Sequence, residues 1–157
     1  MTRKLDSTDW RIVKELMADG SLTNVALAGK VGLSAPPCLR RVRALEEAGV
    51  ITGYTAIVDE QALGFDLTAF AMVGLHNQSE ADLRTFENRI LGWPIVREAF
   101  MLSGETDYIL KCVARDLPSF QTFILKELTA VPNVASVKTT LAIRRAKLAP
   151  GVPVAPE

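Results

Sequence analysis

The sequence predicts an α+β protein with two parts. The first is an N-terminal, winged-helix-like three-helix domain that contains a helix-turn-helix, and the second is a C-terminal ferredoxin-like βαββαβ sandwich. Two short amphipathic helix patterns meet at a glycine near the N-terminus, and a strand–helix–strand order occurs twice after residue 65. The predicted boundaries are 1–50 for the helix-turn-helix domain, 51–64 for a linker strand and hinge, 65–145 for the sandwich and 146–157 for a flexible tail.

The first helix should begin at Asp6 and end before Gly20. Asp6 and Asp9 have the spacing of a capping box, and negative charge stabilises the start of a helix. An apolar stripe follows, made of Trp10, Val13, Leu16 and Met17.

The next two helices should be joined by a tight turn. Thr23 is placed to cap the second helix, Gly32 to end it and Ser34 to cap the third. Pro36 and Pro37 fall in the first turn of the third helix, where a missing N–H matters least. The pattern is typical of a helix-turn-helix, which lays its second helix in the major groove of DNA.

The third helix has one apolar and one cationic side. At about 100° per residue, Cys38, Val42 and Leu45 share one side, whereas Arg40 and Arg43 point roughly the opposite way. A solvated helix face is one reading of these charges. The agreement of caps, turn and spacing favours binding to double-stranded DNA. The predicted DNA-binding residues are Lys30, Ser34, Pro36, Arg40, Arg41 and Arg43.

The rest of the chain is rich in strand patterns. Residues 50–58 form a β-rich stretch that could extend the first domain or pair across a dimer, and the polar segment 59–64 reads as a hinge. Strands are expected at 65–76, 95–103, 108–114 and 134–143, with helices starting after the cap Ser79 and spanning 117–128. Two βαβ units in tandem give a four-stranded sheet with both helices on one face.

Both faces of the strand at 65–76 are largely apolar. The helices cover only one face, and an exposed apolar sheet face usually marks an interface. A second copy of the chain is the simplest cover, so we predict a homodimer. Such a dimer would present two recognition helices to half-sites about one turn of DNA apart.

Composition excludes several other classes. Formal net charge is zero, 48% of residues are hydrophobic and 23% are charged, as in soluble globular proteins. No apolar run approaches the ~20 residues that cross a bilayer, so no membrane role is expected. His76 is the only histidine, and Cys38 and Cys112 are far apart, so we expect no catalytic residues, no metal site, no disulfide and a cytoplasmic location.

Two segments carry a resemblance to a known family: LDSTDWRIVKELMADGSLTNVALAGKVGLSAPPCLRRVRALEEAGVITGYTAIVD, and GETDY at Gly104 to Tyr108. The chain resembles the Lrp/AsnC (leucine-responsive/asparagine-sensing, or feast/famine) transcriptional regulators. The resemblance implies a helix-turn-helix domain, a linker strand and a ferredoxin-like effector domain that forms dimers and often octamers. It also implies that a small effector, most often an amino acid, binds between dimers and alters DNA binding or assembly. The segment Ala35-Pro36-Pro37 departs from the more polar residues of many relatives.

The turn at 103–107 is the predicted effector site. Glu105 and Asp107 offer carboxylates to an α-ammonium group, whereas Thr139 and Thr140 of a neighbouring subunit offer hydroxyl and N–H groups to a carboxylate. A plain β-turn is the alternative, and the resemblance favours the effector site. The predicted residues are Met101, Ser103, Gly104, Glu105, Asp107, Thr139 and Thr140; no cofactor is expected.

Two other functions stay open at this point. Ferredoxin-like sandwiches also support catalysis, although no nucleophile–base pair is visible in the sequence. An architectural DNA-binding protein would have the same helix-turn-helix without sequence discrimination. The sequence does not identify the effector, the regulated genes, the direction of regulation, or octamer against tetramer or dimer.

Overall fold

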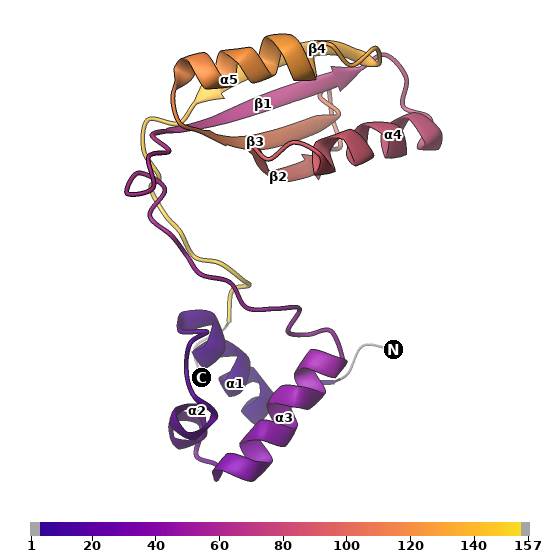
Figure 1. Cartoon of the computed structure of the whole chain (residues 1–157). Helices are drawn as coiled ribbons and strands as arrows, with labels where there is room; N and C mark the ends of the chain where they lie inside the picture. Colours follow the sequence, from indigo (N-terminus) through magenta and orange to yellow (C-terminus); the bar gives the residue numbers. More distant parts are fainter. Residues whose placement is uncertain (1–3, 155–157) are drawn as a thin grey trace. The chain divides into compact units, whose positions relative to one another are not determined.

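The computed structural model describes residues 4–154, which form two compact units. One unit contains residues 4–57 together with 147–154, and the other contains residues 58–146. Helices make up the regular structure of the first unit, and a sheet with helices that of the second (Figure 1).

The first unit contains α1 (Ser7–Ala18), α2 (Asn24–Val31) and α3 (Ala35–Glu47). The capping box at α1 is confirmed: Asp6 Oδ1 accepts a hydrogen bond from the Asp9 amide at 2.8 Å, and Asp9 Oδ2 accepts one from the Asp6 amide at 3.4 Å. Thr23 caps α2 as predicted, because its hydroxyl accepts from the Ala26 amide. Gly32, with φ 73°, ends α2 in the left-handed conformation that glycine adopts at low cost.

The core of this unit lies where the three helices meet. Its buried hydrophobic residues are Ile12, Leu27, Ala28, Val31, Cys38 and Leu45. On α3 the buried side is the predicted one, with Val42 partly buried beside Cys38 and Leu45. On α1 the phase differs from the predicted stripe, because Ile12 is fully buried whereas Trp10 is exposed. The stripe omitted Ile12, which lies four residues before Leu16 on the same side of the helix.

Within one chain, the β-rich stretch at residues 50–58 forms no strand, and its pairing across a dimer stays a prediction. The amides of Val50 and Ile51 both donate to the Leu45 carbonyl, so the chain first winds off the end of α3. A strand requires a paired neighbour, and no other described strand pairs with this segment. Tyr54 anchors the segment instead, because its hydroxyl donates to Glu46 Oε1 at 2.8 Å.

The second unit has the predicted ferredoxin-like topology (Figure 1). Its sheet contains β1 (Leu67–Leu75), β2 (Val96–Met101), β3 (Tyr108–Ala114) and β4 (Val134–Leu141) in the order β2-β3-β1-β4, with every neighbouring pair antiparallel. Helix α4 (Glu80–Leu91) connects β1 to β2. Helix α5 (Leu117–Phe123), continued by a π-helical turn η1 (Ile124–Leu128), connects β3 to β4.

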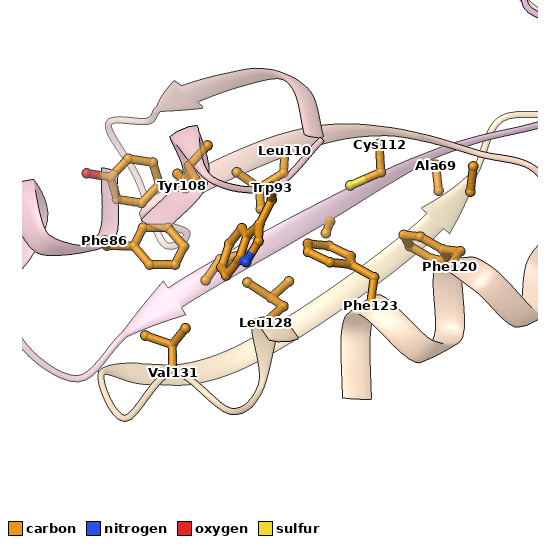
Figure 2. Close-up of a cluster of buried hydrophobic side chains, with 14 of the residues drawn as sticks. Ala69, Phe86, Trp93, Tyr108, Leu110, Cys112, Phe120, Phe123, Leu128 and Val131 are labelled. Carbon is orange, nitrogen blue, oxygen red and sulfur yellow. The ribbon is translucent and has the colours of Figure 1, made fainter. Parts of the chain in front are cut away.

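Both helices pack on one face of this sheet. Figure 2 shows Phe86 of α4 and Phe123 of α5 in one buried cluster with Trp93 and Tyr108. Ring centroids are 5.0 Å apart for Phe86 and Tyr108 and 5.2 Å apart for Trp93 and Phe123, distances at which aromatic pairs attract. The cluster is continuous with the buried residues of β1, which are Ala69, Ala71, Val73 and Leu75.

The chain beyond β4 makes two contacts that the sequence pattern did not predict. Arg145 Nη2 lies 2.7 Å from Glu60 Oε1, which ties this segment to the turn after residue 58. Further on, residues 147–154 belong to the first unit, where Gly151 lies against Met17 of α1. A Cβ added at Gly151 would lie 2.8 Å from Met17 Sδ, and its φ of 90° also favours glycine there.

Candidate DNA-binding helix and effector turn

Ser34 is the N-cap of α3, as predicted, but its side chain makes no capping hydrogen bond. An N-cap hydroxyl accepts from the amide two or three residues further on. Those residues are Pro36 and Pro37, which have no N–H. The first amide to bond back is therefore that of Cys38, which donates to the Ser34 carbonyl at 3.2 Å. The exposed hydroxyl of Ser34 has no partner in the described part of the chain.

The turn between α2 and α3 is held by one side chain. Asn24 Nδ2 donates to the Ala35 carbonyl at 2.8 Å, which joins the first residue of α2 to the first residue of α3. Leu33 in the turn packs against the core of the first unit. The start of α3 is thus fixed relative to α2 from two sides.

Two arginines of α3 face solvent. Arg40 and Arg43 are exposed, and neither has a hydrogen-bond or ion-pair partner among residues 4–154. Pro36 is exposed at the same side, four residues before Arg40. We call Pro36, Arg40 and Arg43 the outward surface of α3; it offers two guanidinium groups that have no partner among residues 4–154. The exposed hydroxyl of Ser34 lies at the N-terminal end of the helix.

The other two predicted cations have internal partners. Arg41 Nη1 lies 2.8 Å from both Asp6 Oδ2 and Asp9 Oδ1, so its guanidinium is turned toward α1. Lys30 Nζ lies 3.0 Å from Glu15 Oε2 and stays exposed at the end of α2. The structure therefore groups Arg40 and Arg43 with Pro36 and separates Arg41 from them.

In the second unit, the predicted effector turn joins β2 to β3. Ser103, Gly104 and Glu105 are exposed, and Met101, 55% exposed, ends β2 just before them. Asp107, at the far end of the turn, is half-buried. The four turn residues Ser103, Gly104, Glu105 and Asp107 lie together in one short segment.

Asp107 also has a structural role that the sequence did not reveal. Its Oδ2 accepts a hydrogen bond from the Leu75 amide at 2.6 Å, and its own amide donates to the Val73 carbonyl at 3.0 Å. These bonds form where the register of β1 against β4 shifts, between Gly74 and Leu75. Asp107 therefore joins the turn to the end of β1.

The two predicted threonines lie apart from this turn within one chain. Thr139 pairs with Ala71 and Thr140 with Phe70, on the edge strand β4, whereas the turn starts from the opposite edge strand β2. Successive side chains of a strand point to opposite faces. Thr139 therefore shares the helix-covered face with Ala71, and Thr140 shares the other face with Phe70.

Tyr108 is a further residue beside the turn. It is buried directly after Asp107, and its hydroxyl donates to Glu87 Oε1 at 3.0 Å. Burial, with a smaller contribution from Glu87, raises the pKa of Tyr108 to about 12. The alternating pattern of β3 could have identified it as an inward residue, but its partner on α4 could not be found from spacing.

On the sheet face opposite the helices, β1 presents largely apolar residues, as predicted. Phe70, Met72 and Ile109 are partly buried on it, and Phe100 is 58% exposed. Lys111 and Glu98 form an ion pair on this face, with Nζ and Oε1 2.5 Å apart. We call this surface the open sheet face.

The order of the two units agrees with known proteins. Residues 5–52 match the sequence model for a winged helix-turn-helix DNA-binding domain. Residues 68–152 match the Lrp/AsnC ligand binding domain. These two domains in this order define a DNA-binding transcriptional regulator that carries a ligand-binding domain.

Relatives share this organisation over nearly the whole chain. The chain is 58% identical to the leucine-responsive regulatory protein of Rhizobium meliloti (strain 1021) over 144 residues, which cover 92% of each protein. It is 38% identical to the transcriptional regulator AzlB of Bacillus subtilis (strain 168), over 96% of each. The chain belongs to the Lrp/AsnC family of transcriptional regulators.

Solved structures support the same conclusion. A transcriptional regulator from Neisseria meningitidis in complex with L-Met matches with a TM-score of 0.90 and 33% identity, over 96% of this chain and 97% of that one. An AsnC family transcriptional regulator from Agrobacterium tumefaciens matches with a TM-score of 0.89 and 31% identity, over 95% and 97%. Among the described residues, no helix is both long and apolar enough to cross a membrane.

Proposed function

We propose that this regulator binds double-stranded DNA through the outward surface of α3 and responds to an amino acid bound at the turn 103–107. The observation that carries the DNA contacts is the pair of exposed, unpartnered guanidinium groups of Arg40 and Arg43, on a helix whose opposite side is in the core. Guanidinium groups bind phosphates and guanine edges in the major groove. Ser34 and Pro36 would lie beside the bases, and Lys30 near the backbone.

The DNA contacts can be tested with a duplex enriched by the protein from a random pool. We expect Arg40→Ala combined with Arg43→Ala to weaken binding at least about tenfold in a gel-shift titration, because each contact to a base or phosphate contributes ~1–3 kcal/mol. Arg84→Ala is the matched control, since Arg84 is an exposed arginine of α4 paired with Glu80. Unchanged affinity of the double variant would remove both arginines from the interface.

We propose that the effector is an amino acid. Glu105 and Asp107 supply carboxylates for its ammonium group, with Met101, Ser103 and Gly104 around them and Thr139 and Thr140 of a neighbouring copy near its carboxylate. The L-Met complex of the Neisseria meningitidis relative supports this ligand class.

A screen of the twenty amino acids for thermal stabilisation, with L-Met as the first probe, tests the ligand class. A hit should change DNA affinity by a coupling free energy of about 1–3 kcal/mol, and DNA should change the affinity for the hit equally. The amino acid should be recovered unchanged, because an enzyme would convert it. A protein that none of the twenty stabilises would contradict the proposal.

We further propose that two copies pair through the open sheet face, and that dimers associate further, up to octamers, in the cytoplasm. The exposed Phe100 and the apolar residues beside it support the pairing. Between dimers, the turn of one copy and the threonines of another could meet at one ligand.

A further inference from the structure

We infer that Arg41 is a positioning residue: its ion pairs with Asp6 and Asp9 hold α3 in the rotation that turns Arg40 and Arg43 outward. This inference rests on the proposed DNA contacts of Arg40 and Arg43. It assigns Arg41 a different role from its two neighbours, although the three arginines fall within four residues of one helix.

The contact joins parts of the chain that are far apart in sequence. Arg41 of α3 bonds to Asp6 and Asp9, which are 35 and 32 residues earlier, at the start of α1. The other oxygen of each carboxylate takes part in the capping box, because Asp6 Oδ1 accepts from the Asp9 amide and Asp9 Oδ2 from the Asp6 amide. One pair of aspartates therefore both starts α1 and holds α3.

The burial of Asp9 makes its ion pair with Arg41 consequential. Asp9 is only 2% exposed, and the side chain of Arg41 is 33% exposed. A buried carboxylate that loses a charged partner is destabilising, whereas an exposed ion pair contributes little. The hydrogen bond from the Asp9 amide and the Arg41 guanidinium lower the pKa of Asp6, so Asp6 stays charged near neutral pH.

Helix geometry links this contact to the outward arginines. Successive residues are about 100° apart, so Arg40 lies about 100° and Arg43 about 160° around the axis from Arg41. With Arg41 turned onto α1, neither neighbour points at that surface, and both are exposed. Besides the ion pairs, the rotation of α3 depends on the packing of Cys38, Val42 and Leu45 and on the Asn24 hydrogen bond at its first residue.

The salt dependence of DNA binding separates positioning from contact. Each lysine or arginine that neutralises a phosphate contributes about 0.9 to the slope of log association constant against log salt concentration. On one enriched duplex, we expect Arg40→Gln and Arg43→Gln each to weaken binding and lower the slope. Arg41→Gln should weaken binding about fivefold or more without a change of slope, and Arg41→Lys, which can still pair with the aspartates, should restore most of the affinity.

A second set of variants approaches the cluster from its acidic side. Asp9→Asn removes a negative charge, and such a charge cannot attract DNA, so its loss alone should not weaken binding. We nevertheless expect this variant to bind DNA more weakly with an unchanged salt slope, because Arg41 loses a partner that positions α3. Because both residues belong to one network, the double change Arg41→Gln with Asp9→Asn should weaken the free energy of DNA binding by less than the sum of the two single changes. Asp6→Asn, at an exposed position, is the milder variant if circular dichroism shows that Asp9→Asn does not fold.

Different results would overturn different claims. A slope lowered by about one in Arg41→Gln would make Arg41 a DNA contact, and unchanged affinity in Arg41→Gln and the folded aspartate variant would show that the ion pairs do not position α3. If Arg40→Gln and Arg43→Gln changed neither affinity nor slope, the proposed DNA surface itself would be wrong, whatever Arg41 does. Arg84→Gln controls for the general loss of positive charge.

Discussion

Ser34 shows how a single neighbouring residue decides what a side chain is free to do. In α1, α2, α4 and α5 the N-cap side chain accepts a hydrogen bond from the amide three residues later. In α3 that position is Pro37, so Ser34 keeps the cap position but not the cap bond. The two prolines were visible in the sequence, and the missing bond follows from their chemistry rather than from tertiary structure.

This reasoning predicts the effect of restoring the amide. In the native sequence, Ser34→Ala should change the free energy of unfolding little. In a Pro37→Ala background, the new amide can bond to Ser34, and Ser34→Ala should then cost about 1 kcal/mol. Urea unfolding of the four proteins measures the difference, and the cycle cancels the separate effect of proline on the unfolded chain. Equal costs in both backgrounds would contradict it.

Both tyrosines of the chain should resist ionisation. Burial, with a smaller contribution from Glu87, raises the pKa of Tyr108 to about 12, and partial desolvation together with Glu46 raises the pKa of Tyr54, which is 52% exposed, in the same direction. The folded pKa values lie above the ordinary value of 10.0, so the unfolded chain loses these protons first as the pH rises. The contribution of the two protonated tyrosines to the free energy of unfolding is therefore complete below pH 10 and is lost as the pH rises toward 12. Tyrosinate absorbance and far-UV circular dichroism should therefore change together. In the variant Tyr54→Phe, Tyr108 is the only tyrosine. A tyrosinate absorbance that rises near pH 10 while this variant is still folded would contradict the burial of Tyr108.

At the scale of elements, Asp107 joins the end of β1 to the turn 103–107, and we expect this residue to have two separate roles. Asp107 holds the Leu75 amide with one oxygen, and we propose that its charge also serves the ammonium group of the effector. A strand end whose buried amide loses its acceptor is destabilised by about 1–3 kcal/mol.

We therefore expect Asp107→Ala to lose stability in the second unit and Asp107→Asn, which keeps an acceptor oxygen, to retain most of it. Both variants should lose the response of DNA binding to the amino acid found in the screen. Thermal unfolding and DNA titration with that amino acid distinguish the roles. A full response in Asp107→Asn would leave Asp107 as a structural residue alone.

The elements themselves were largely predictable, because each has a strong hydrophobic period and clear end signals. The capping box at Asp6, the cap at Thr23 and the strand at 108–114 were all placed correctly from the sequence. The stretch 50–58 has high strand propensity but forms no strand within one chain, because a strand also needs a paired neighbour, which propensity does not supply. The ion pairs of Arg41 could not be predicted, because angular spacing cannot reveal an acidic pair on another helix.

For the whole molecule, the open sheet face is the feature that bears on assembly. We propose that a second copy covers it, and Phe100 is its most exposed aromatic residue among those described. Removing such a side chain from water at an interface is favourable, whereas a buried unpaired carboxylate is strongly unfavourable.

We expect Phe100→Glu to shift the protein toward single subunits in light scattering and sedimentation at the same concentration. Leu91→Glu is the matched control: Leu91 is 84% exposed, but it belongs to α4, which packs on the other face of the sheet. A Phe100→Glu protein of unchanged mass would place the subunit contact elsewhere.

The contact of Gly151 with Met17 of α1 changes how the molecule can be divided for experiments. A half-protein cut after residue 57 would omit the segment 147–154 that lies on α1 in the intact chain. An isolated DNA-binding unit that keeps this contact needs both pieces, joined by a short artificial loop.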